Sequence, residues 1–155
     1  VAESRGICER TKFDTIRPMA MDDDPLWEAF QAHALTQSEW THEAHLRIAW
    51  MHVTRYPLDE AHVRMRVGII RLNERHGLVE SPERGYFETL TRVWLVLVLA
   101  AQRERHADSS PALLAACPEL LERERPLRHY SREILKTVRA RAIFVEPDLA
   151  PLPEV

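Results

Sequence analysis

The residues best suited to chemistry lie together in one short segment, Trp40-Thr41-His42-Glu43-Ala44-His45-Leu46. If the chain is helical over residues 41–55, His42 and His45 share a face with the apolar residues of that helix. On the same helix Glu43 points the opposite way, toward water. An imidazole that faces the core needs a partner, because an unpaired buried polar group costs about 1–3 kcal/mol. The two histidines are therefore candidates for proton transfer or for metal binding.

The pattern His-Glu-Ala-His at residues 42–45 differs from the zinc-protease motif HExxH by one residue. That motif places its histidines at positions i and i+4, with the general-base glutamate between them. Here the spacing is i and i+3, and Glu43 faces away together with Arg47, so we exclude a protease of this class. Glu39 and His42 match the Glu-x-x-His of di-iron helical bundles, but the chain has no second copy of that pattern.

A carboxylate to join the histidines comes from a second segment, Gly85-Tyr86-Phe87-Glu88-Thr89-Leu90-Thr91. Glu88 lies at the start of a helix whose later turns are apolar on the same face, so we expect it to approach a pocket. His42, His45 and Glu88 would then hold one divalent ion, Zn, Fe or Mn, with an open position for water or substrate. Such an ion supports hydrolysis or oxidation of a small molecule. The alternative is that Glu88 forms an exposed ion pair with Arg92, four residues further along the helix.

Two functions without a metal also stay open. In the first, His42 or His45 is a general base that Glu88 orients. In the second, the protein is not a catalyst: the histidines are structural, and the protein binds a small ligand or another protein. Arg66 is a further residue that could reach the site. The expected ligand-binding residues are mostly aromatic or polar side chains from several predicted helices: Trp40, His52, Asn73, Tyr86, Thr91 and Trp94.

The composition argues against nucleic-acid and membrane partners. The net charge is −3 and the isoelectric point is near 6.3, so no basic surface is expected to attract nucleic acid or anionic lipid. The longest apolar run, residues 93–101, has nine residues, about half of the ~20 needed to cross a bilayer. Cys8 and Cys117 form no metal or disulfide pattern, and residues 1–20 have no secretion-signal pattern. We expect a cytoplasmic protein with a small-molecule partner, and the oligomeric state stays open.

The positions of prolines and capping residues predict an all-α fold, a bundle of five or six helices. Residues 1–20 show no periodicity and are expected to form a weakly ordered arm, whereas residues 21–155 form a single helical domain. The helix at about residues 83–106 is apolar all round, so it should lie at the centre of the bundle. The last helix is expected at residues 130–142. Three closely spaced prolines after it predict an extended tail.

Two motifs resemble a family of small helical bacterial proteins: WTHxAHL at residues 40–46 and GYxETLT at residues 85–91. The resemblance extends over most of the chain, from about residue 25 to residue 153. It implies a shared helical fold and a shared site around the two histidines and Glu88, and it implies no particular reaction. Members of the family often have a histidine at the position of Phe87. If that histidine binds a metal or transfers a proton, this chain has lost it.

Overall fold

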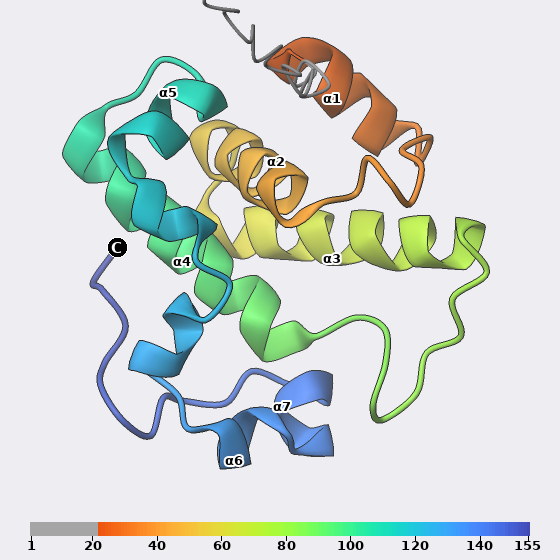
Figure 1. Ribbon diagram of the computed structural model, residues 1–155, viewed down its shortest axis with the longest axis vertical. Helices are drawn as coiled ribbons and strands as arrows, with labels where there is room; N and C mark the ends of the chain where they lie inside the picture. Colours follow the sequence, from red (N-terminus) through yellow and green to blue (C-terminus); the bar gives the residue numbers. More distant parts are fainter. Residues whose placement is uncertain (1–21) are drawn as a thin grey trace, which may run out of the picture.

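The computed structural model describes residues 22–155, and within them every regular element is a helix (Figure 1). The predicted arm, residues 1–20, lies outside the described residues. The α-helices of the described chain are α1 (Asp23–Gln31), α2 (His42–Arg55), α3 (Leu58–Arg75), α4 (Glu88–Arg105), α5 (Ser110–Ala116), α6 (Arg132–Leu135) and α7 (Val138–Ala142). Two short 3-10 helices, η1 (Pro118–Leu121) and η2 (Arg125–Arg128), lie between α5 and α6.

The prediction of five or six helices is wrong by at least one, because the single helix expected at residues 130–142 is divided into α6 and α7. The division occurs at Thr137, whose hydroxyl accepts a hydrogen bond from the amide of Ala140 at 3.1 Å. Thr137 is therefore the N-cap of a new helix and not an interior residue of a continuous one.

Helix α2 begins where a threonine can cap it. The hydroxyl of Thr41 accepts a hydrogen bond from the amide of Ala44 at 3.2 Å, and the helix ends before Pro57, which cannot continue it. The reciprocal bonds of a capping box do form upstream, between Thr36 and Glu39, but they close a turn that does not continue as a helix. Helix α2 packs against α1, α3, α4 and α5, so its residues face neighbours on most sides.

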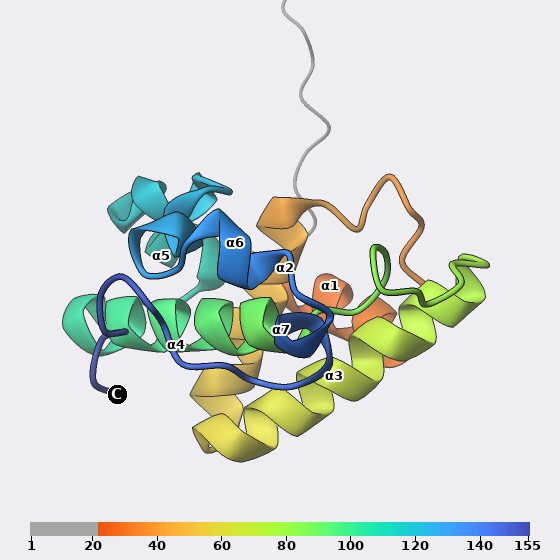
Figure 2. The same ribbon diagram turned by 90° about the horizontal axis from the view of Figure 1, so that it is seen from below.

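Helix α4 begins at Glu88, five residues later than the predicted start at residue 83. The residues before it form a loop that contains an isolated pairing of Ser81 with Arg84 and, at Gly85, a φ of +110° that helical geometry excludes. The helix ends at Arg105, and the C-cap residue His106 adopts a left-handed conformation with φ of +49°. Helix α4 packs against α2, α3, α5 and α7, and Figure 2 shows α7 beside its first turns. The arrangement of the bundle around this helix stays a prediction.

Arg47 is buried, which corrects the prediction that it meets water. Only 3% of the residue is exposed, because α1 and α5 cover the side of α2 that the helical period assigns to solvent. Its guanidinium lies 3.1 Å from the carboxylate of Asp23 on α1 and donates to the hydroxyl of Ser110 on α5 at 2.9 Å. Ser110 also binds Asp23 through its amide and hydroxyl, so three helices meet at one polar cluster.

After α7 the chain has no regular structure. The tail is held by hydrogen bonds: the hydroxyl of Tyr130 donates to the carbonyl of Val145 at 2.8 Å, and the amide of Leu149 donates to the carbonyl of His129 at 3.0 Å. Over residues 22–155, no helix combines the length and the apolarity needed to cross a membrane.

Candidate functional site

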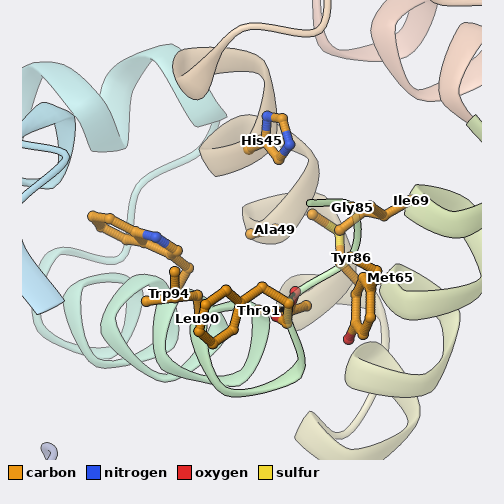
Figure 3. Close-up of a pocket in the computed structure, with 10 residues that line it drawn as sticks. His45, Ala49, Met65, Ile69, Gly85, Tyr86, Leu90, Thr91 and Trp94 are labelled. Atoms are coloured by element: carbon orange, nitrogen blue, oxygen red, sulfur yellow. Dashed lines mark hydrogen bonds between the residues drawn. The ribbon is translucent and has the colours of Figure 1, made fainter. Parts of the chain in front are cut away.

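A pocket of about 200 Å³ lies between α2, α3, α4 and the loop that precedes α4 (Figure 3). Helix α2 contributes His45 and Ala49 to its lining, one helical turn apart. Helix α4 contributes Leu90, Thr91 and Trp94 from its first two turns. The sequence predicted His45, Thr91 and Trp94 as site residues, and the structure brings these three together.

The other walls of the pocket come from α3 and the loop. Met65 and Ile69 face it from α3, and Gly85, Tyr86 and Phe87 face it from the loop. Tyr86 was predicted as a ligand-binding residue and does line the pocket. Met65 and Ile69 were not predicted as site residues, because apolar residues at helical spacing look the same whether they line a pocket or fill the core.

His45 and Tyr86 are the titratable side chains among the described residues that line the pocket. His45 lies in α2, whose N-cap is Thr41. Its Nδ1 lies 2.7 Å from the carbonyl oxygen of Thr41, which can only accept, so Nδ1 carries the proton. The ring of Trp40 stacks on the imidazole, with 3.6 Å between ring centroids. Burial, together with smaller effects of the nearby His42 and Arg123, lowers the pKa of His45 to about 4, although the hydrogen bond to the Thr41 carbonyl opposes this. Near pH 7 the imidazole is therefore neutral, and Nε2 carries a free lone pair.

His42 lies close to His45 but does not line the pocket. Its Nε2 lies 3.2 Å from the carbonyl oxygen of Leu120 in η1, and its ring meets the ring of Trp94 edge-on at 4.9 Å. Burial lowers the pKa of His42 and Arg123 lowers it further, against the effect of the Leu120 carbonyl. His42 therefore supports the wall of the pocket behind Trp94.

Glu88 is buried, and its partners are not the predicted histidines. Its carboxylate accepts both a 2.9 Å hydrogen bond and a second, close one from the guanidinium of Arg66, and a 2.8 Å hydrogen bond from the hydroxyl of Tyr86. Nε2 of His62 lies 3.3 Å from the same carboxylate, but not in a direction that makes a hydrogen bond. The alternative of an exposed Glu88–Arg92 pair is wrong, because Arg92 binds Asp59 at 2.8 Å. The structure does not bring Glu88 together with His42 and His45.

The group of Glu88, Arg66, Tyr86 and His62, of which Glu88 and His62 are buried, borders the pocket through Tyr86. Burial lowers the pKa of His62, although the negative charge of Glu88 opposes this. Burial and the Glu88 charge both raise the pKa of Tyr86. Its phenol therefore stays protonated and works as a hydrogen-bond donor to Glu88. Among the described residues, no three His, Cys, Asp or Glu side chains gather as ligands for a metal ion. The metal site of His42, His45 and Glu88 stays a prediction from sequence.

Two further residues predicted to bind a ligand lie away from the pocket. His52 is fully buried beside the rings of Trp27 and Phe30, and its Nδ1 lies 2.8 Å from the carbonyl oxygen of Ile48. Asn73 lies near the end of α3 and donates to the carboxylate of Glu80 at 3.4 Å. Trp40 contacts the pocket indirectly, through His45.

The loop that forms one wall is held from α7. The guanidinium of Arg141 donates to four carbonyl groups of residues 82–86, at 2.9–3.3 Å, and lies 4.6 Å from the centre of the Phe87 ring. The loop also needs glycine at position 85, because its φ of +110° is strained for any residue with a side chain. The carboxylate of Glu80 lies against this glycine and accepts a hydrogen bond from the amide of Tyr86. No sequence pattern indicates that residues more than fifty positions apart cooperate in this way.

The comparisons with known proteins assign no family to this arrangement. No family model, no curated protein and no solved structure matches the chain. The resemblance carried by the two sequence motifs stays a prediction.

Proposed function

We propose that this protein binds a small molecule in the pocket beside His45, and that the neutral imidazole is the group that orients it. The observation that carries the proposal is the state of this ring. Its Nδ1 proton is bound to the Thr41 carbonyl, its face is stacked on Trp40, and it lines an otherwise mostly apolar pocket. Such pockets, lined by apolar and aromatic side chains with a few fixed polar groups, are typical of small-molecule sites.

The size of the pocket limits the ligand. Its volume is about 200 Å³. Apolar cavities of roughly 150 Å³ accept a molecule the size of benzene. A single six-membered ring with one or two substituents therefore fits, whereas a nucleotide or a peptide does not. The wall residues Tyr86, Phe87 and Trp94 offer ring faces and edges to such a ligand.

The chemistry of His45 favours binding over catalysis. A general base works best when its pKa lies near the operating pH, and burial holds the pKa of His45 at about 4. The imidazole is thus a weak base but a permanently available hydrogen-bond acceptor. The role of Glu88 as the group that orients the histidines is not supported, because the Thr41 carbonyl orients His45 and Arg66 holds Glu88.

The proposal is tested by titrating ring-sized molecules into the protein while recording the NMR signal of the Trp94 indole. We expect binding that is lost when Ala49→Leu fills the pocket from α2. The matched control is Ala112→Leu, at an exposed position of α5 outside the pocket, which should bind like the wild type. Binding that survives Ala49→Leu, or no binding of any ring-sized molecule at millimolar concentration, would refute the proposal.

A further inference from the structure

We infer that the pocket selects a neutral ligand that has a hydrogen-bond donor on its ring, a phenol or another small aromatic with a hydroxyl or N–H group. This inference rests on the proposed function and names the class of ligand for the same site. It follows from the positions of the protons and charges around the pocket.

The first step concerns His45. Its one proton lies on Nδ1 and is donated to the carbonyl of Thr41. Its Nε2 has no hydrogen-bond partner among the described residues and, as a neutral imidazole nitrogen without a proton, can only accept. Figure 3 shows the ring on α2, across the pocket from the side chains of α4. The Nε2 lone pair is therefore the acceptor that His45 offers to a ligand in this pocket.

The second step concerns the two hydroxyl groups of the lining. The hydroxyl of Thr91 donates its proton to the carbonyl of Phe87 at 2.8 Å, and the hydroxyl of Tyr86 donates its proton to the carboxylate of Glu88 at 2.8 Å. Both protons are engaged within the protein, so neither hydroxyl can donate to a ligand. Among the polar groups of the lining, His45 Nε2 and the Thr91 oxygen are acceptors and the indole N–H of Trp94 is a donor, so a ligand hydroxyl, which both donates and accepts, complements them.

The lining residues also decide the charge of the ligand. Among the described residues that line the pocket there is no Asp, Glu, Lys or Arg, the His45 imidazole is neutral near pH 7, and the Tyr86 phenol stays protonated. A charged ligand would lose its hydration without meeting an opposite charge, so a neutral ligand is favoured.

The inference is tested with four probes of one size: phenol, toluene, benzoate and benzylamine. Their dissociation constants are measured by NMR titration with the wild-type protein at pH 7. We expect phenol to bind at least as tightly as toluene, and both charged probes to bind more weakly than phenol. In a pocket without a partner for the hydroxyl, toluene should bind about tenfold more tightly than phenol, because an unpaired buried hydroxyl costs on the order of 1–3 kcal/mol.

The variants His45→Phe and Thr91→Val identify the acceptor. At least one of them should reverse the order, so that toluene binds about tenfold more tightly than phenol. Thr54→Val is the matched control: Thr54 makes the same hydroxyl bond to the carbonyl four residues earlier, at 2.8 Å, but lies on the exposed side of α2. If His45→Phe does not fold, the inference is still tested by the Thr91→Val variant and by the order in which the wild-type protein binds phenol and toluene.

The outcomes separate this inference from the proposed function. Three results would overturn the inference and leave the pocket as a binding site. The wild-type protein could bind toluene about tenfold more tightly than phenol, or it could bind benzoate or benzylamine most tightly. The third result is that both variants keep the wild-type preference between phenol and toluene. If none of the four probes binds, the proposed function fails, and the inference fails with it.

Discussion

Removing Arg66 should destabilise the protein more than neutralising its partner Glu88. The side chain of Glu88 is 9% exposed and that of Arg66 is 39% exposed. When Glu88→Gln removes the negative charge, the guanidinium of Arg66 can turn to water. When Arg66→Met removes the guanidinium, the buried carboxylate cannot do so and keeps only Tyr86 and His62 as neighbours.

The expected magnitudes follow from this asymmetry. Breaking a buried ion pair by removing one partner costs 3–5 kcal/mol, and the remaining contacts of Glu88 bring our expectation for Arg66→Met to about 3 kcal/mol. For Glu88→Gln, which keeps the shape and loses charged hydrogen bonds, we expect about 1 kcal/mol. The double variant should resemble Glu88→Gln alone, with a coupling on the order of 3 kcal/mol between the two positions.

The assay is urea denaturation followed by circular dichroism, with thermal melting as a second measure. For a chain of this size a loss of 3 kcal/mol corresponds to roughly 6–12 °C in melting temperature. The control is Arg71→Met, which removes an ion pair to Glu74 in which both side chains are more than half exposed, and which should change stability by less than about 1 kcal/mol. If Glu88→Gln costs as much as Arg66→Met, or if the two losses add, the burial argument is refuted.

Three further predictions concern pH, the loop and metal. Burial lowers the pKa of His52 to about 4 in the folded state, against about 6.5 in the unfolded state. Between these pH values the unfolded chain binds more protons than the folded one. The free energy of unfolding should therefore fall as the pH drops from about 6.5 to about 4. His52→Phe should make the denaturation curves less dependent on pH in that window, and an unchanged slope would contradict this. Arg141→Ala removes the bonds that hold residues 82–86, so amide hydrogen exchange should quicken there and phenol binding should weaken; unaltered exchange would show that the loop does not need this anchor. Because Arg66 and Tyr86 occupy the carboxylate of Glu88, protein purified without a tag and incubated with Zn²⁺ should retain less than one equivalent; a full equivalent that is lost in His45→Phe would restore the metal prediction.

The sequence was most informative within single helices. A helical period of 3.6 residues predicted that His45 faces inward, and Thr41 together with Pro57 gave the limits of α2 closely. The aromatic and polar residues near residue 90 are predicted as site residues because they precede or begin a helix whose later turns are apolar: Tyr86 lies in the loop before α4, and Thr91 and Trp94 lie in its first two turns. These features depend on local chemistry, which one sequence contains.

The sequence was least informative about contacts between helices. The period of α4 gives the face of Glu88 but not its neighbour, which depends on how α3 lies across α4. In the structure Glu88 contacts Arg66 and His62 of α3, and not the histidines of α2. Arg47 is a second case, since its burial depends on Asp23 and Ser110, residues 24 and 63 positions away. No helical period encodes which side of a helix a distant segment will cover.

The most direct test of the proposed site is the ¹⁵N NMR spectrum of the His45 imidazole during a titration with phenol at pH 7. We predict that Nε2 of the free protein carries no proton and that its resonance moves when phenol binds and donates to it, whereas toluene causes a much smaller change. A protonated Nε2 in the free protein, or a resonance that phenol binding leaves unchanged, would contradict the proposal that His45 receives the ligand.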